Sequence, residues 1–392
     1  MCILELNVEM NQLYERMASK IPEMVRHVVK PQLLEKAIQK CQERNGKEVA
    51  EVDLVTAMFE VTPPAFQPTM IEDLKDVGID VDRYYAKVGS NFKHSTDLEQ
   101  MVADVEKVCK IADVGCNKDA MWKVIRAYEK FFVGSSVSMR TTTKEKEKRD
   151  VAIRYVELMV PHNPDAYQIA LENDLIKQDG HPIHDFMREI KDKFEVMGYG
   201  VDLDARKGLA KIWPFLVPGP IEPVYDMKFI PPAVKNYQEY FKKHGLDIFS
   251  LFALDFRSKT TNIYFMIKDH LSATPEKYSK LLEDAGFTPG SKKIMESCCK
   301  ALTIYYTYSW ESEKIERVCF GMVCPDERDV PVELHPLMKK FLDEAPIISS
   351  NRHFIYSIAF TPKGEYYKVE TDYNDTMVDL LKMGSQAGLD TA

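Results

Sequence analysis

The feature that most constrains the fold of this chain is a repeated order of segments, in which two helical stretches precede two short alternating stretches. Apolar and polar residues alternate, as in half-buried strands, in five successive pairs of segments. The pairs are 135–142 with 151–159, 196–202 with 208–216, 248–256 with 261–267, 301–308 with 316–323, and 353–361 with 365–373. Helical periodicity occurs before the first pair at 98–110 and 118–131, and later at 183–194, 231–244, 275–285, 333–344 and 375–385.

About five repeats of one unit predict an α+β fold with a quasi-symmetric architecture. An antiparallel sheet of ten strands has two unpaired edges, and closing the sheet into a barrel removes both. We therefore expect a closed ten-stranded antiparallel β-barrel surrounded by helices, built from five ααββ units.

The alternation also predicts what each face of the barrel contacts. In the stretch 316–323, Val318 and Phe320 alternate with Arg317 and Cys319, and successive side chains of a strand point to opposite faces. One face is apolar and suits packing beneath helices, whereas the other carries cations, tyrosines and small polar groups. If the helices lie outside, the second face lines the interior. An interior lined by Arg, Lys and Tyr predicts a ligand chamber instead of a packed core.

Cations recur on the face that is predicted to line this chamber. They are Arg140, Arg154, Lys211, Arg317 and Lys368, and the hydroxyl and amide groups of Asn262, Tyr264, Thr303 and Tyr305 share these faces. Guanidinium and ammonium groups pair with phosphate oxygens, so a convergent set predicts a polyphosphate site. Any single one of these residues could equally point to solvent at a strand end, but the repetition over five strands favours the site.

The chain as a whole carries the opposite charge. Its 392 residues hold 52 Lys+Arg and 61 Asp+Glu, a formal net charge of −9. Sequence-independent binding of nucleic acid needs a basic footprint, so we expect no nucleic-acid partner and a small anion held by locally gathered positive charge. Eight cysteines without a CxxC pair, and the lack of a signal peptide or an 18-residue apolar run, predict a cytoplasmic protein without a membrane span.

Several stretches occur in the order found in the aromatic prenyltransferases of the ABBA fold. They are DGHPIHDFM (Asp179–Met187), KFIPPAVKNYQEYFKKHGLD (Lys228–Asp247), GLDIFSLFALDFRSKTTNIYF (Gly245–Phe265), TIYYTYSWESEKIERVCF (Thr303–Phe320) and TPKGEYYKVETDYN (Thr361–Asn374). The chain resembles that family over roughly residues 98–388. The resemblance implies a barrel of five ααββ units. It also implies an enzyme that moves a prenyl group from a dimethylallyl or geranyl diphosphate to an electron-rich aromatic small molecule by Friedel–Crafts alkylation.

The resemblance also implies roles for individual residues. Lys211, Arg317 and Lys368 match positions that bind the allylic diphosphate, and together with Tyr305 they form the predicted catalytic set. The wider diphosphate site is expected to comprise Arg140, Arg154, Lys211, Lys259, Asn262, Tyr264, Tyr305, Arg317 and Lys368. The acceptor pocket is expected to comprise Trp213, Phe215, Ser250, Thr303 and Asp372. Asp372 could serve the acceptor, or it could be a salt-bridged wall residue.

Two positions differ from the magnesium-dependent members of the family that the chain resembles. Arg154 stands where such members carry a carboxylate that helps to hold Mg²⁺, and Ser258 stands where they carry a diphosphate-binding lysine. Lys259 would face away in a regular strand, but a bulge could return it to the site. Arg154 and Arg140 can supply positive charge without a metal, and the chain has no Asp-Asp dipeptide for a DDxxD metal box. We therefore expect no metal site, no required cofactor and no essential Mg²⁺.

The aperiodic segment 87–97 divides the expected barrel, residues 96–392, from a small all-α module, residues 1–95. Within the module, KIPEMVRHVVKPQLLEKAIQKCQERNGKEVAEVDLVTAMFE (Lys20–Glu60) resembles the small helical domain of light-independent protochlorophyllide reductase subunits, but no iron–sulfur cysteine set accompanies it. We expect an interaction module that binds a protein partner or a second copy. A lid or a stabilising appendage is the alternative.

A different class of function for the barrel is a non-catalytic carrier of an aromatic or isoprenoid ligand. A neutral ligand of this kind would not offset the burial of Lys211, Arg317 and Lys368. The three cations therefore favour the enzyme over the carrier.

Overall fold

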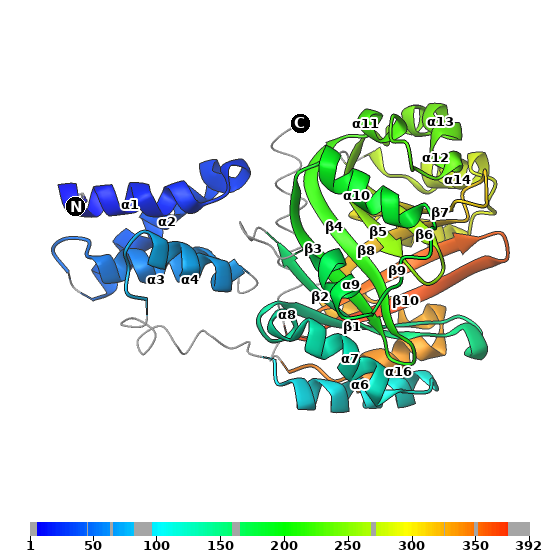
Figure 1. The fold of residues 1–392 in the computed structure, drawn as a ribbon, viewed down its shortest axis with the longest axis horizontal. Coiled ribbons are helices and arrows are strands. Elements are labelled where there is room, and N and C mark those ends of the chain that lie inside the picture. The colour runs from blue at the N-terminus through cyan, green and yellow to red at the C-terminus, as the bar shows by residue number, and fades with distance from the viewer. Residues whose placement is uncertain are drawn as a thin grey trace.

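The structure is a computed structural model, and it describes residues 6–44, 46–62, 66–81, 96–158, 165–267, 272–324, 326–348 and 352–374. Ten strands close into one antiparallel barrel, in which each strand pairs with its neighbours in sequence and β1 also pairs with β10 (Figure 1). They are β1 (Ser136–Thr142), β2 (Val151–Leu158), β3 (Val196–Asp204), β4 (Gly208–Pro220), β5 (Ile248–Asp255), β6 (Thr260–Met266), β7 (Thr303–Ser309), β8 (Arg317–Cys324), β9 (Phe354–Thr361) and β10 (Gly364–Asp372). The predicted closed ten-stranded barrel is confirmed.

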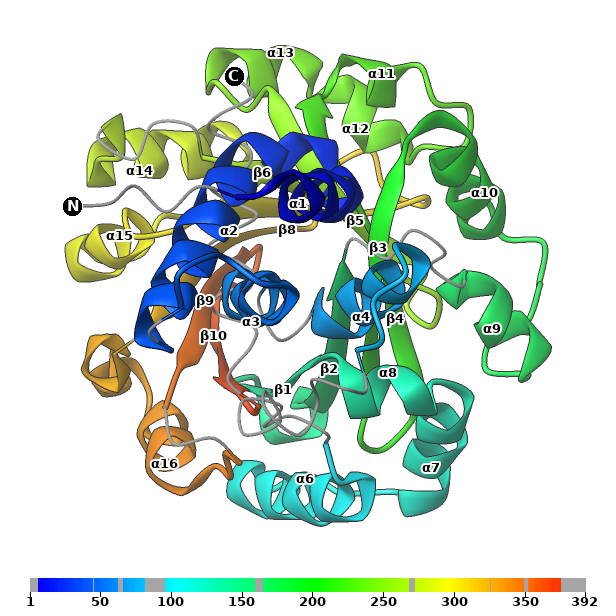
Figure 2. The ribbon, with the colours of Figure 1, turned by 90° about the vertical axis from the view of Figure 1, so that its left-hand side faces the viewer.

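Helices connect successive hairpins and form a ring outside the barrel (Figure 2). They are α6 (Leu98–Ala112), α7 (Lys118–Ala127), α8 (Glu129–Gly134), α9 (Ala166–Glu172), α10 (Ile183–Lys193), α11 (Glu222–Tyr225), α12 (Pro232–Asn236), α13 (Gln238–Lys243), α14 (Pro275–Asp284), α15 (Lys292–Cys298) and α16 (Pro336–Glu344). Short 3₁₀ turns lie at η2 (Lys146–Lys148), η4 (Glu327–Asp329) and η5 (Val332–Leu334). The helix expected at 231–244 is divided into α12 and α13, and the one expected at 375–385 lies outside the described residues.

The main apolar core lies between this ring and the outer face of the barrel. In α10, Ile183, Phe186, Met187 and Ile190 recur at helical spacing and are all buried. The Phe186 ring packs edge-on against Phe252 of β5, with 5.3 Å between the ring centroids. The outward-facing residues of each strand are therefore held by helices, which leaves the inward-facing residues free to line a chamber.

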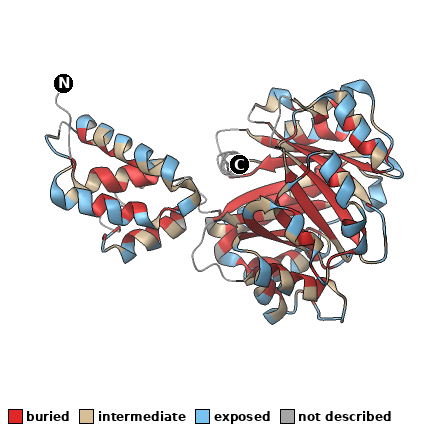
Figure 3. Cartoon of the chain, turned by 90° about the horizontal axis from the view of Figure 1, so that it is seen from above, coloured by how far each residue is buried: buried red, intermediate tan, exposed pale blue. Residues whose placement is uncertain are grey.

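The N-terminal helices form a separate bundle with its own core (Figure 3). The helices are α1 (Val8–Lys20), α2 (Glu23–Glu43), α3 (Glu51–Val61) and α4 (Gln67–Asp76). Met17, Leu33 and Leu54 are among the fully buried residues of this core. The bundle lies over one end of the barrel, opposite the end at which the strands turn in hairpins (Figures 1 and 2). Among the described residues, no helix is both long and apolar enough to cross a lipid bilayer.

Candidate active site

The barrel encloses a cavity of about 700 Å³ that is lined by inward-facing residues of all ten strands. Charged side chains gather towards the hairpin end, where Lys144, Arg206 and Arg257 line it. Apolar side chains gather at the other end, where Met266 and Ile355 line it. Such a gradient suits a ligand with an anionic head and an apolar body, since each part would meet a matching wall.

Three half-buried cations in the middle of the cavity, Lys211, Arg317 and Lys368, form no ion pair with a carboxylate among the described residues. Arg317 donates to the Tyr366 hydroxyl at 3.0 Å and more weakly to Asn262 Oδ1 at 3.4 Å, and its Nε atom is buried without a partner. Lys368 Nζ donates to the Tyr305 hydroxyl at 2.5 Å. Buried cations that are paired only with neutral groups are costly, so this arrangement favours an anionic ligand.

The pKa values of the two lysines reflect their enclosure in the cavity. Burial lowers the pKa of Lys211 to about 8; the Asp255 carboxylate opposes this shift, and the nearby cation Arg317 adds to it. Burial also holds the pKa of Lys368 well below its ordinary value, again with Arg317 as a repulsive neighbour. A bound dianion would raise both pKa values, because an opposite charge favours the protonated ammonium form.

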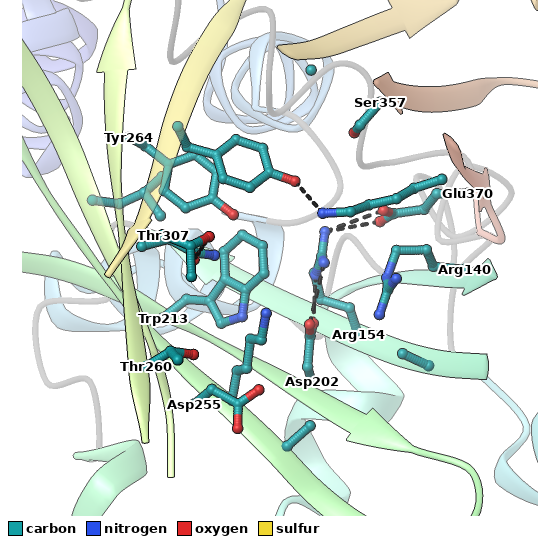
Figure 4. Close-up of a pocket in the computed structure, with 18 of the residues that line it drawn as sticks. Arg140, Arg154, Asp202, Trp213, Asp255, Thr260, Tyr264, Thr307, Ser357 and Glu370 are labelled. Atoms are coloured by element: carbon teal, nitrogen blue, oxygen red, sulfur yellow. Dashed lines mark hydrogen bonds and ion pairs between the residues drawn. The ribbon is translucent and has the colours of Figure 1, made fainter. Parts of the chain in front are cut away.

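The two remaining predicted cations are neutralised within the protein. Arg140 forms an ion pair with Asp150 at 2.6 Å. Arg154 lies between two carboxylates, bonding Asp202 at 2.6 Å and Glu370 at 3.1 Å (Figure 4). These carboxylates offset much of the positive charge that the sequence led us to expect from the two arginines.

The Arg154 network also fixes one wall of the cavity. Glu370 accepts a hydrogen bond from the Ser138 hydroxyl at 2.5 Å. The Arg154 guanidinium lies over the Trp213 ring, 4.0 Å from its centroid. Paired charges and a cation–π contact therefore hold the indole in place.

Aromatic faces line the cavity next to the unpaired cations. The rings of Tyr264 and Tyr305 are stacked, with 4.2 Å between centroids and 17° between planes. The Trp213 ring lies 5.4 Å from that of Tyr264. Burial raises the pKa of both tyrosines, so they are neutral phenols at ordinary pH. Electron-rich rings of this kind attract a nearby cation.

Most residues that the sequence nominated for the site line this cavity. These are Arg140, Arg154, Lys211, Trp213, Phe215, Ser250, Asn262, Tyr264, Thr303, Tyr305, Arg317 and Lys368. On β8, Arg317 and Gly321 face the cavity, as strict alternation predicts. On β4, both Ala210 and its neighbour Lys211 line the cavity, and so do Leu216 and its neighbour Phe215, so strict alternation fails there. Register shifts along β4 explain the failure, because each shift reverses the faces of the residues beyond it.

Two nominated residues do not line the cavity. The prediction that Lys259 contributes to the diphosphate site was wrong. Lys259 adopts a left-handed backbone, φ 53°, in the turn between β5 and β6, and its side chain pairs with Asp179 at 2.5 Å. Ser258 lines the cavity in its place. The prediction that Asp372 lines the acceptor pocket was also wrong. Asp372 lies on the same face of β10 as Lys368, but it is the last residue of the strand and lies beyond the part that lines the cavity. Its side chain is fully buried.

Sequence reasoning missed the acidic partners in this cavity. Asp202 ends the predicted stretch 196–202 and lies directly opposite Arg154 in the register of β2 and β3. An inward-facing acid opposite an inward-facing arginine was the available signal, but only the register reveals that the two residues pair. Among the described residues, no group of three or more His, Cys, Asp and Glu side chains could hold a metal ion.

Comparison with known proteins places the barrel in a family. The family described as aromatic prenyltransferase Orf2 matches residues 96–384. A 5,10-dihydrophenazine-1-carboxylate 9-dimethylallyltransferase of Streptomyces anulatus is 28% identical over 280 residues, which are 70% of this chain and 93% of the relative. A flaviolin linalyltransferase of Streptomyces virginiae is 25% identical over 300 residues, 75% of this chain and 99% of the relative.

Among solved structures, a 6-dimethylallyltryptophan synthase of Micromonospora olivasterospora, in complex with DMASPP and Trp, covers 70% of this chain and 97% of its own, with a TM-score of 0.42 and 12% identity. The sequence match extends over nearly the whole barrel, including every strand that lines the cavity. This chain belongs to the aromatic prenyltransferase Orf2 family.

Proposed function

We propose that this enzyme transfers a prenyl group from an allylic diphosphate to an electron-rich aromatic small molecule inside the barrel, without a need for Mg²⁺. The observation that carries the proposal is a set of three cavity cations that form no ion pair among the described residues, Lys211, Arg317 and Lys368, next to the stacked rings of Tyr264 and Tyr305. Dimethylallyl and geranyl diphosphates fit the polar-to-apolar gradient of the cavity, with the diphosphate among the cations and the tail against the rings.

The three cations would act on the leaving group. As the allylic C–O bond breaks, its electron pair goes to the diphosphate, and preorganised cations stabilise the negative charge that develops there. Tyr305, which accepts the hydrogen bond from Lys368, would orient that lysine towards the same group. Lys211, Arg317, Lys368 and Tyr305 are therefore the proposed catalytic set.

The aromatic wall would act on the other fragment. The allylic cation is attracted to the faces of Tyr264, Tyr305 and Trp213. An arene held beside it, in the space near Phe215, Ser250 and Thr303, then forms the new C–C bond and loses a proton to recover its aromaticity. The proton can pass to the departed diphosphate or to water.

Independence from Mg²⁺ is supported by the ion pairs of three acids near the arginines of the cavity. Asp202 and Glu370 both pair with Arg154, and Asp150 pairs with Arg140, so these carboxylates are already neutralised by guanidinium groups. The positive charge that a metal ion would bring to the diphosphate is available from the unpaired cations.

A direct assay tests the proposal. Purified full-length protein is incubated with dimethylallyl or geranyl diphosphate, with acceptors that include dihydrophenazine carboxylates, dihydroxynaphthoquinones, phenols and indoles, and with EDTA. We expect prenylated product together with diphosphate release. Tight binding of an aromatic ligand without diphosphate release under any condition would contradict the proposal and support a carrier.

We also propose that the enzyme is cytoplasmic and that its chain has two domains. The cysteines among the described residues are free thiols, which suits the reducing cytoplasm. The family match begins at residue 96, which supports a division of the chain into a module of residues 1–95 and a barrel of residues 96–392.

A further inference from the structure

One aromatic residue of the N-terminal bundle is buried away from that bundle's own core. Phe66 precedes α4 and is 9% exposed. It does not belong to the core of helices α1 to α4, but to the apolar cluster inside the barrel. That cluster also contains Val156, Trp213, Phe215, Leu251, Ala253, Tyr264, Tyr305, Cys319 and Ala359.

The position of Phe66 is fixed by its neighbour in sequence. The Gln67 side chain is buried, and its Nε2 atom donates to the backbone oxygens of Phe59 and Thr62, both at 3.1 Å. These bonds tie the start of α4 to the end of α3. The backbone that carries the Phe66 side chain is thus anchored by hydrogen bonds within the bundle.

The barrel residues that cluster with Phe66 lie towards the apolar end of the cavity. All the hairpin turns lie at the opposite end, where Lys144, Arg206 and Arg257 line the cavity. The bundle lies over the end from which the helical connections leave (Figures 1 and 2). The charged end is left for a diphosphate to enter, and the apolar end is covered.

We propose that Phe66 is a specificity-determining residue that closes the apolar end of the barrel, and that the N-terminal bundle holds it in that position. This inference rests on the proposed function. The phenyl ring would limit the length of the acceptor or prenyl tail beside Trp213 and Phe215, and it would keep water away from the allylic cation. Water that reached the cation would add through its oxygen and lose a proton, which gives a prenyl alcohol instead of the aromatic product.

The first test does not depend on turnover. The chain has three tryptophans, and replacement of Trp122 and Trp310 by Phe leaves Trp213 as the reporter inside the barrel. In this background, F66A should increase the quenching of Trp213 fluorescence by acrylamide several-fold. F66L should restore most of the protection, and V28A, which truncates an exposed residue of α2, should leave the quenching unchanged. Circular dichroism checks that each variant is folded.

The second test uses the reaction. For F66A we expect a several-fold larger share of prenyl alcohol among the products, and turnover of acceptors that the parent excludes. Unchanged quenching in folded F66A would overturn the inference whether or not the parent is active. An active parent whose F66A variant keeps the same product ratio and acceptor range would overturn it as well. An inactive parent would contradict the proposed function and leave the quenching result to decide the position of Phe66.

Discussion

Replacement of Arg317 by methionine should separate catalysis from stability. Arg317 is half-buried, donates hydrogen bonds only to the neutral Tyr366 and Asn262, and has a buried Nε atom without a partner. A cation about 4 Å from a unit negative charge interacts by about 4 kcal/mol at an effective dielectric constant of about 20. Loss of one preorganised charge-stabilising group typically lowers kcat by about 10²–10³. We therefore expect R317M to lose about 10²–10³ in kcat/KM for the allylic diphosphate.

The same substitution should not destabilise the free protein. An apolar side chain of similar length removes a buried cation that has no carboxylate partner, and Asn262 Oδ1 keeps its 2.7 Å bond from Thr307. The free energy of unfolding should stay constant or rise. The matched control is R154M, in the same cavity, which would leave Asp202 and Glu370 without their guanidinium and should cost about 3–5 kcal/mol.

Steady-state kinetics and urea unfolding of the two variants provide the test. An R317M variant that unfolds at a much lower urea concentration than the parent would show that Arg317 stabilises the fold, which would contradict its role as an unpaired cation that binds an anion. An R317M variant with parental kcat/KM would refute the role of Arg317 at the diphosphate.

Three further outcomes follow from the same geometry. Burial lowers the pKa of Lys211 from 10.5 to about 8, so kcat/KM should fall as the pH rises through about 8. Because the unfolded chain binds more protons between 8 and 10.5, the unfolding free energy of the ligand-free enzyme should rise over that window, and this rise should be smaller in a K211M variant, which retains Lys368. Turnover measured in EDTA should equal turnover in Mg²⁺, and a strict requirement for the metal would contradict the use of protein cations. K259A should keep the parental KM for the diphosphate, since Lys259 pairs with Asp179, and a large rise in KM would place it at the site after all.

Sequence reasoning succeeded where local periodicity carries the information. The strand pairs and the inward positions of Arg317 and Lys368 follow from alternation with period two, which the strands retain after folding. The sequence-based prediction failed where the place of a residue along its strand, or its partner on another strand, decides whether the residue belongs to the site. Asp372 has the right face but lies beyond the cavity, and Arg154 is neutralised by partners on two other strands.

The N-terminal bundle illustrates the same limit on a larger scale. Its helices follow from their own apolar spacing, but nothing in the local pattern around Phe66 indicates that this side chain contributes to a different core. The predicted binding of a partner or a second copy through this bundle remains a prediction.

A crystal structure of the full-length enzyme with a thio-analogue of geranyl diphosphate, grown in EDTA, would show where the diphosphate and the prenyl tail bind. We expect diphosphate oxygens within hydrogen-bonding distance of Lys211, Arg317 and Lys368, with the prenyl tail along Tyr264 and Tyr305 towards the apolar end. A diphosphate that binds at another place in the cavity, or that binds only when Mg²⁺ is supplied, would contradict this expectation.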